Sequence, residues 1–319
     1  LTLWRRLIHL WTSRVVLWVV LVVSTVLLLL LPTGLERELH PPGVPVVTGW
    51  SGAAYGQGIS DFLNGVAARD LPYVQDDGRV INFFPYLANS WWNSFRLFAA
   101  VVGIALPLGL VLGALFVARA RWLRAAGSVL PILGQALPDF FLVMLAHTIA
   151  IWAYRVYGVR LWPVLAEPGV ERGWLVPMIA LVAFPAGYLA RLTAASLDEV
   201  IHSDYIRTAR AKGLPEWRVI GRHALASAWP RILSGLPTAL NMTLSGLVVV
   251  ERLTVWPGLA RWLVPQESFL IDSGGFQITG IGPPIVALTG ALFITWFVLV
   301  DALTRSIAIV GLKGGSALS

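Results

Sequence analysis

Six stretches of this sequence are long and apolar enough to cross the hydrocarbon core of a lipid bilayer. They cover residues 15–31, 95–117, 127–154, 174–192, 236–263 and 284–309. A helix needs roughly 20 apolar residues to cross that core. Only 13% of the residues are charged and the mean hydropathy is +0.73, whereas a soluble domain carries about 25% charged residues. The sequence therefore predicts an all-α, polytopic transmembrane helical bundle with six spans.

The first apolar stretch resembles the core of a secretory signal peptide, because Arg5, Arg6 and Arg14 precede it. It is longer than the roughly 7–15 apolar residues of such a core, and residues 32–35 (Pro-Thr-Gly-Leu) do not form a small-residue cleavage site. We therefore interpret residues 1–31 as an N-terminal segment followed by an uncleaved first span.

The rest of the chain divides by composition. Residues 32–90 are polar and rich in Pro and Gly, which predicts a loop with one short helix near residues 59–67. We expect residues 91–312 to form the main transmembrane domain, with a long loop at 196–234, and residues 313–319 to form a tail.

Lys and Arg residues indicate the orientation of the spans. They concentrate in the N-terminal segment, in the turn with Arg119, Arg121 and Arg124, and in the 191–231 segment. All three lie on one side of a six-span topology, and short basic loops face the cytoplasm. Both termini are therefore predicted to be cytoplasmic, and the 32–90 loop extracytoplasmic. The net charge of +7 is spread over these short segments, which favours a membrane-lipid environment and predicts no nucleic-acid partner.

The loop between the fourth and fifth spans carries signals for a helical hairpin. Ser203 can cap a helix whose first turn contains Asp204, and Gly213 can end that helix just after Lys212. Pro215 suits the first turn of a second helix. The sequence predicts a helix, a glycine turn and another helix.

This hairpin is expected to present small and apolar side chains among basic residues. The apolar set is Tyr205, Ile206, Ala209 and Leu214, and the basic set is Arg207, Arg210, Lys212, Arg218 and Arg222. Such a surface suits docking into the groove of a partner protein. It equally suits an amphipathic helix held on anionic headgroups, and periodicity and charge do not separate the two interpretations.

The string Asp204-Tyr205-Ile206-Arg207-Thr208-Ala209-Arg210-Ala211-Lys212-Gly213-Leu214, followed by Arg222-His223-Ala224-Leu225, resembles the "EAA" loop of ABC importer permeases of the dipeptide, oligopeptide and nickel systems. Residues 188–193, 250–253 and 257–259 also match the family pattern, so the resemblance covers roughly residues 87–262. The Pro-Gly-Asp-Pro and Asp-Pro-Arg motifs usual in the peptide branch are missing.

The resemblance implies an ABC type I importer permease in a bacterial or archaeal cytoplasmic (inner) membrane. Its implied partners are a second permease subunit, two cytoplasmic ATPase subunits that hold ATP and Mg, and an extracytoplasmic substrate-binding protein. The substrate would be a peptide or a similar small solute, with nickel as the alternative. The implied ATPase-coupling residues are Asp204, Tyr205, Arg207, Thr208, Ala209, Arg210, Ala211, Lys212, Gly213 and Leu214.

The sequence carries no motif for catalysis, nucleotide binding or metal binding by this chain. A phosphate-binding Gly-x-x-x-x-Gly-Lys-[Ser/Thr] motif is missing, the His residues lack metal-ligand spacing, and the chain has 0 Cys. We therefore expect no enzyme activity and no bound cofactor or metal. An ion-coupled secondary transporter or channel would need an inverted repeat, and an intramembrane enzyme would need a catalytic constellation; neither pattern is evident.

Polar residues within the apolar stretches are candidates for a translocation path, because such residues at membrane depth face a cavity or another helix. Gln135 and Asp139 are expected on one helical face of the third span, and Asn241 and Ser245 on one face of the fifth. Hydrogen bonding between helices is the alternative role. The set proposed to line or gate the path is Gln135, Asp139, Asn241, Ser245, Glu251, Pro257 and Gly258.

Overall fold

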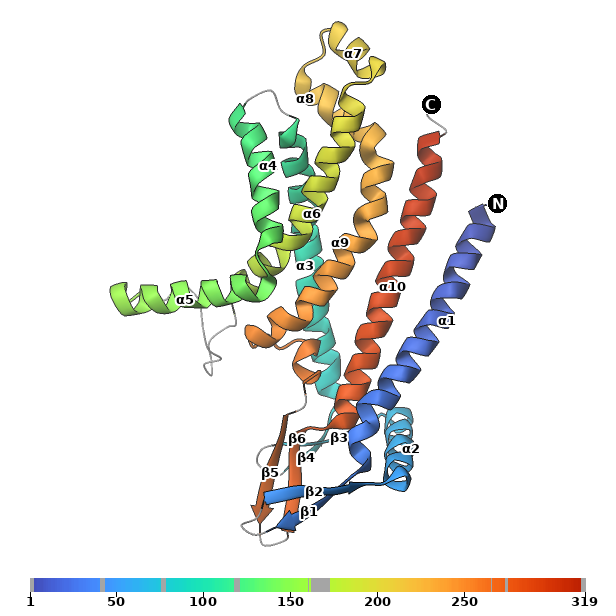
Figure 1. Ribbon diagram of the computed structural model, residues 1–319, viewed down its shortest axis with the longest axis vertical. Coiled ribbons are helices and arrows are strands. Elements are labelled where there is room, and N and C mark those ends of the chain that lie inside the picture. Colours follow the sequence, from blue (N-terminus) through green and yellow to red (C-terminus); the bar gives the residue numbers. More distant parts are fainter. Residues whose placement is uncertain are drawn as a thin grey trace. The chain divides into compact units, whose positions relative to one another are not determined.

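The computed structural model describes residues 3–40, 44–75, 79–117, 121–159, 161, 173–264, 266–272 and 275–316 (Figure 1). Within them, the α-helices are α1 (Leu3–Leu30), α2 (Gly52–Ala68), α3 (Phe84–Phe116), α4 (Arg121–Ala136), α5 (Asp139–Tyr157), α6 (Leu175–Ile201), α7 (Asp204–Ala211), α8 (Glu216–Arg218), α9 (Leu225–Leu253) and α10 (Pro283–Ser316). The strands are β1 (Leu35–His40), β2 (Val44–Trp50), β3 (Pro72–Val74), β4 (Val80–Asn82), β5 (Gln266–Asp272) and β6 (Gly275–Ile281). Short 3₁₀ segments cover Leu31–Gly34 and Leu259–Trp262, and a π-helical turn covers Val219–Ala224.

Six helical segments are long and apolar enough to cross a membrane, as predicted. They are Trp4–Gly34, Phe84–Phe116, Asp139–Tyr157, Leu175–Ile201, Glu216–Leu253 and Pro283–Val310. The six-span helical bundle is therefore confirmed, although several ends differ from the prediction. The second span begins within the predicted 32–90 loop. The fifth begins earlier than residue 236 and ends at Leu253 rather than Leu263.

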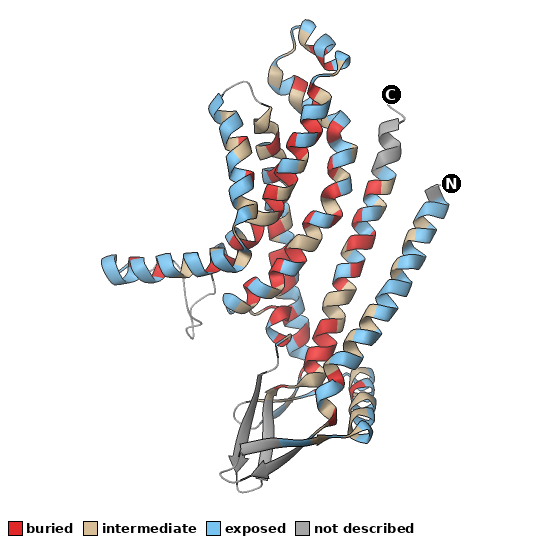
Figure 2. Cartoon of the chain, in the orientation of Figure 1, coloured by how far each residue is buried: buried red, intermediate tan, exposed pale blue. Residues whose placement is uncertain are grey.

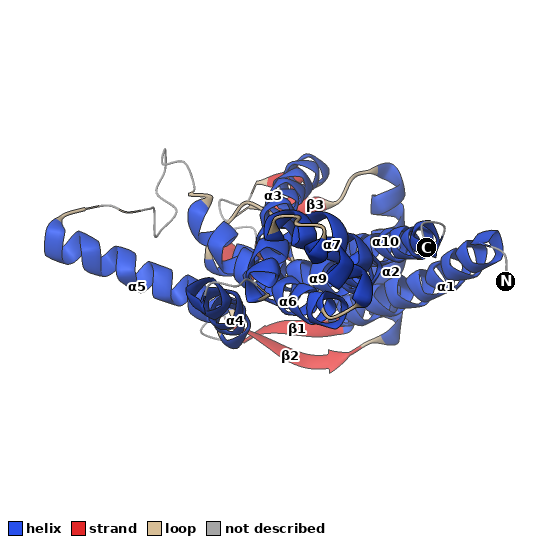
Figure 3. Cartoon of the chain, turned by 90° about the horizontal axis from the view of Figure 1, so that it is seen from above, coloured by secondary structure: helices blue, strands red, loops and turns tan. Residues whose placement is uncertain are grey.

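The predicted third span, 127–154, is not one helix. The chain forms α4 and then α5, with a break at Leu137 and Pro138. Pro138 cannot donate a backbone hydrogen bond, and its ring disfavours a helical conformation for Leu137. The two helices therefore point in different directions, and α5 runs across the direction of α4 (Figures 1 and 3).

The chain divides into two compact units, each described by itself. The first contains Leu1–Thr12, Phe95–Trp256 and Leu299–Ser319. Its buried residues gather along α6 and α9 (Figure 2). Small residues let the helices approach closely: a Cβ added to Gly113 of α3 would lie 2.6 Å from the carbonyl oxygen of Ala190 on α6, and one on Gly134 of α4 would lie 2.7 Å from that of Ala183. Such packing of small residues is typical of membrane helices.

The second unit contains Ser13–Ser94 and Pro257–Val298. Here β1 and β2 form an antiparallel hairpin, and the second sheet has the order β4-β3-β6-β5, in which Val74 pairs with Gly280. An apolar core that includes Phe62, Phe83 and Trp262 lies in this unit. The predicted 32–90 loop therefore contains strands as well as a helix, α2, that is longer than the predicted 59–67 segment.

Candidate functional site

The predicted hairpin between the fourth and fifth spans is present. Helix α7 ends at Ala211, and Gly213 follows in the left-handed region with φ of 73° and donates its N–H to the carbonyl of Arg210 at 2.9 Å. A residue with a side chain is strained at such a φ, so glycine fits this turn. Pro215 directly precedes α8, and its carbonyl accepts the N–H of Arg218 at 2.9 Å. Figure 1 shows α7 and α8 beyond the adjoining ends of α6 and α9.

The prediction that Ser203 caps α7 is correct in position, but the predicted side-chain hydrogen bond is not formed. Ser203 stands at the N-cap position of α7, but its hydroxyl makes no capping hydrogen bond. Its Oγ is buried without a hydrogen-bond partner among the described residues. The carbonyl of Ser203 instead accepts the N–H groups of Ile206 and Arg207, each at 3.1 Å. Asp204 lies in the first turn as predicted, and it pairs with Arg207 at 3.3 Å.

The apolar residues of the hairpin do not all face outward, contrary to the prediction. Ile206 is 0% exposed and Ala209 is 6% exposed, and both belong to an apolar cluster with Leu197, Ile201, Val219, Ala224, Ala228 and Ile232. Leu214 packs against the same cluster. This cluster, called here the anchor cluster, attaches the hairpin to α6 and α9. Burial of its apolar surface stabilises that attachment.

The outward face of the hairpin carries other side chains. Tyr205 is 44% exposed and Trp217 is 70% exposed. The remaining exposed members of the predicted set are Asp204, Arg207, Thr208, Ala211, Lys212 and Gly213. Trp217 was not among the predicted site residues. Its signal in the sequence was a large aromatic residue two positions after Pro215, which precedes the second helix of the hairpin.

An ion pair holds the two arms of the hairpin together. Nη2 of Arg210 lies 2.6 Å from Oε1 of Glu216, and both side chains are partly buried. A second ion pair joins Arg231 of α9 to Glu199 of α6. Charge-assisted hydrogen bonds of this kind are stronger than neutral ones. The hairpin is therefore fixed internally as well as attached to the spans.

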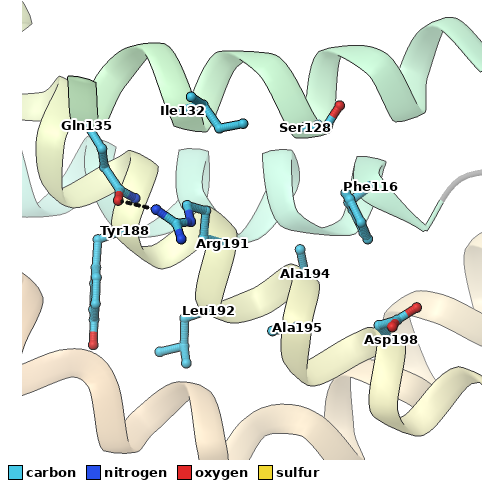
Figure 4. Close-up of a pocket in the computed structure, with 11 residues that line it drawn as sticks. Phe116, Ser128, Ile132, Gln135, Tyr188, Arg191, Leu192, Ala194, Ala195 and Asp198 are labelled. Atoms are coloured by element: carbon cyan, nitrogen blue, oxygen red, sulfur yellow. Dashed lines mark hydrogen bonds between the residues drawn. The ribbon is translucent and has the colours of Figure 1, made fainter. Parts of the chain in front are cut away.

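Gln135 and Asp139 do not share a helical face, because the break at Pro138 separates them. Gln135 lies on α4, where its Oε1 accepts a hydrogen bond of 2.9 Å from Nη1 of Arg191 on α6 (Figure 4). Asp139 opens α5 and contacts Gly246 of α9 so closely that a Cβ there would collide with its carboxylate. Within the described residues, Oδ1 of Asp139 is buried without a hydrogen-bond partner.

Asn241 and Ser245 share one face of α9, as predicted, because α9 is continuous there. The amide of Asn241 donates to Oδ1 of Asp301 on α10 at 3.4 Å, and the hydroxyl of Ser245 donates to the carbonyl of Asn241 at 3.0 Å. Asp301 also accepts from Arg305 at 2.9 Å. The sequence analysis did not propose Asp301 or Arg305 as site residues.

The last three predicted path residues follow along the chain at the end of α9. Glu251 is completely buried, and its carbonyl accepts the N–H of Trp256 at 2.9 Å. Pro257 and Gly258 belong to the second unit, in the turn before the 3₁₀ segment, where the carbonyl of Pro257 accepts from Asn93 at 3.1 Å. In the part of the chain that the structure describes, no group of three or more His, Cys, Asp or Glu side chains could hold a metal ion.

Six helices long and apolar enough to cross a membrane, with a hairpin packed on two of them, are the architecture of a multi-pass membrane protein. Residues 105–308 match the family of binding-protein-dependent transport system inner membrane components, and the chain belongs to this family. The family predicted from the hairpin sequence is thereby confirmed, and with it a location in the inner membrane.

Three curated relatives carry related names. A Brucella abortus (strain 2308) protein, named as a peptide transport system permease, is 33% identical over 205 residues, which cover 63% of this chain and 62% of that protein. The dipeptide transport system permease protein DppB of Bacillus subtilis (strain 168) is 34% identical over 172 residues, or 54% of each chain. The glutathione transport system permease protein GsiC of Salmonella choleraesuis is 30% identical over 206 residues, covering 64% of this chain and 58% of GsiC.

Proposed function

We propose that this chain is the transmembrane permease subunit of an ATP-driven ABC importer that carries a peptide or a similar small solute. Family membership supports the permease role. The names of the relatives, which refer to peptide, dipeptide and glutathione transport, support the substrate class and do not favour nickel. The proposed partners are a second permease subunit, two cytoplasmic ATPase subunits that bind ATP and Mg, and an extracytoplasmic substrate-binding protein.

The hairpin is the proposed coupling element between this chain and an ATPase subunit, and its construction is the observation that carries the proposal. Tyr205 and Trp217 are exposed, whereas Ile206 and Ala209 on the opposite side are buried in the anchor cluster. A force on the exposed side therefore passes through packed side chains into α6 and α9, since packed interiors transmit displacement. A loose loop would not transmit it.

The proposed mechanism is alternating access, in which movement of the hairpin changes the arrangement of the spans. Gln135, Asp139 and Asn241 are proposed to lie along the path, because each places a polar group between spans. The hairpin and both termini are proposed to face the cytoplasm, in agreement with the distribution of Lys and Arg. ATP hydrolysis is assigned to the partner ATPases, and this chain transmits work.

The test is co-purification of the ATPase subunits with the detergent-solubilised chain. Trp217→Ala removes an exposed side chain from the proposed contact, and exposed aromatic residues are frequent energetic anchors of interfaces. Trp122→Ala is the matched control, because Trp122 of α4 is 71% exposed and Trp217 is 70% exposed. We expect Trp217→Ala to weaken ATPase binding at least about ten-fold and Trp122→Ala to leave it unchanged.

Two outcomes would contradict the proposal. Failure of the wild-type chain to recruit any ATPase would refute the importer assignment. Equal losses in the two tryptophan variants would show that the contact is not local to the hairpin. Membrane insertion and expression of each variant serve as the internal controls.

A further inference from the structure

A pocket of about 660 Å³ lies among α3, α4 and α6, close to the hairpin end of these helices. It opens next to a very close contact between α4 and α6, where a Cβ on Gly187 would lie 2.7 Å from the carbonyl oxygen of Pro131. Arg191 lies one helical turn after Gly187 on the same face of α6, and its side chain lines the pocket together with Gln135 (Figure 4). The close contact thus places the two side chains against each other.

The positive charge of Arg191 is not balanced by a carboxylate within the part of the chain that the structure describes. Its guanidinium donates to Oε1 of Gln135 at 2.9 Å, but no carboxylate of the described residues lies within ion-pair distance of it. Nε2 of Gln135 is buried without a hydrogen-bond partner within the same part of the chain. Arg191 is exposed and belongs to the basic 191–231 segment assigned above to the cytoplasmic side, so its guanidinium is accessible to a ligand in the pocket. A guanidinium presents several donors in the geometry that a carboxylate accepts.

The opposite charge lies at the other end of the pocket. Asp198 is on the same face of α6 as Arg191, two helical turns away, or about 10.5 Å along the helix axis. Oδ1 of Asp198 lies 4.0 Å from Nε2 of His202, and the side chain of His202 is largely exposed. Figure 4 shows Arg191 pointing toward Gln135 and Asp198 farther along the same helix, with Ala194 and Ala195 of α6 between them. The pocket therefore has a positive end, an apolar middle and a negative end.

We propose that this pocket binds a short zwitterionic peptide, with its terminal carboxylate at Arg191 and its terminal ammonium group at Asp198. An extended chain advances about 3.3–3.6 Å per residue, so a dipeptide about 7 Å long, with a hydrogen bond of about 2.8 Å at each end, is comparable with the axial separation of the two residues. A third residue would exceed it. The inference deepens the proposed import function and rests on it, because it assigns a substrate subsite within the permease.

The surroundings of Asp198 indicate where the occupant goes next. A second pocket, of about 460 Å³, shares Phe116 and Asp198 with the first and extends to Arg210 and Glu216. Those two residues form the ion pair between the arms of the hairpin. A peptide at the subsite thus lies next to the element that is proposed to receive the ATPase, on the side where an imported solute leaves.

Binding of tritiated dialanine to the purified complex in lipid nanodiscs tests the inference, with neither nucleotide nor substrate-binding protein present. Arg191→Gln removes the charge and keeps a polar side chain. Arg155→Gln, at an exposed position in the last turn of α5, is the charge-matched control. Loss of charge-assisted hydrogen bonds lowers affinity about ten-fold or more, so we expect that loss in Arg191→Gln and wild-type affinity in Arg155→Gln. Dialanine amide and N-acetyl-dialanine should each compete at least about ten-fold less well than dialanine.

The inference is overturned if the wild-type complex binds no dialanine, or if Arg191→Gln binds it as the wild type does. It is also overturned if Arg191→Gln changes only the retention of phosphatidylglycerol, which would make the pocket a site for a lipid headgroup. Failure of the proposed function is a separate result, because it appears as absence of the ATPase from the purified complex. In that case dialanine binding is measured on the chain alone.

Discussion

Replacing Gly113 by alanine should disturb the contact between α3 and α6. The added Cβ would lie 2.6 Å from the carbonyl oxygen of Ala190 and 2.5 Å from Cβ of Thr193. Carbon atoms in favourable contact are about 3.5–4.0 Å apart. The two helices would therefore have to separate by roughly 1 Å at this point, and both obstructing atoms are backbone or close to it, so a rotamer change does not relieve the collision.

The expected change in stability caused by Gly113→Ala is the balance of two opposing effects. Overpacking in a close contact costs about 1–3 kcal/mol, whereas alanine is favoured over glycine inside a helix by about 0.5–1 kcal/mol. Gly103, on the same helix, is exposed and has nothing within 4 Å of its added Cβ. Gly103→Ala therefore gains the helix preference of alanine without the cost of overpacking. The difference in stability between the two variants, about 1–3 kcal/mol, thus isolates the packing contact.

The assay is the apparent melting temperature of the detergent-solubilised chain, followed by fluorescence-detected gel filtration. We expect Gly113→Ala to melt below Gly103→Ala by several degrees, since 1 kcal/mol corresponds to about 2–4 °C for a medium-sized domain. Equal melting temperatures for the two variants would refute the close packing of α3 on α6 at this position.

Two further predictions concern the hairpin and α10. Ala209→Asp places a carboxylate in the anchor cluster and should make the hairpin sensitive to limited proteolysis, whereas Thr208→Asp, at an exposed neighbour, should not; equal cleavage of both would contradict the buried position of Ala209. Asp301→Asn should lower stability by about 2 kcal/mol because it leaves Arg305 without its buried carboxylate, and Asp204→Asn, in an exposed pair, by less than about 1 kcal/mol. Melting temperatures check the second comparison, and a larger loss from Asp204→Asn would overturn it.

The spans and the glycine turn could be predicted because their signals are local. Apolar length alone identifies a segment that can cross a bilayer, and Gly213 stands where a helix needs a residue with positive φ. The break at Pro138 could not be predicted in the same way. Pro107 and Pro185 lie inside continuous helices of the same chain, so a proline in an apolar stretch does not by itself decide between a helix and a break.

The direction of the hairpin's apolar face depends on the fold around it. Ile206 and Ala209 have the spacing of an apolar stripe, but the stripe does not say whether it packs on the chain's own spans or on a partner. Among the described strands, β1–β2, β3–β4 and β5–β6 pair as local hairpins, whereas Val74 of β3 pairs with Gly280 of β6, more than 200 residues away. Contacts of that kind are set by the whole fold, and a window of neighbouring residues does not contain them.

The π-helical turn at Val219–Ala224 determines which way the hairpin faces. A π turn holds an additional residue within one helical turn, and each residue of an α-helix accounts for about 100° of rotation and 1.5 Å of rise. If this turn rewound into a regular α-helix, the hairpin would swivel about the axis of α9 by roughly 100°. The direction in which Trp217 points around the axis of the fifth span is thus set by the one additional residue of the π turn. An insertion or deletion at this turn would rotate the hairpin without changing any residue on its surface.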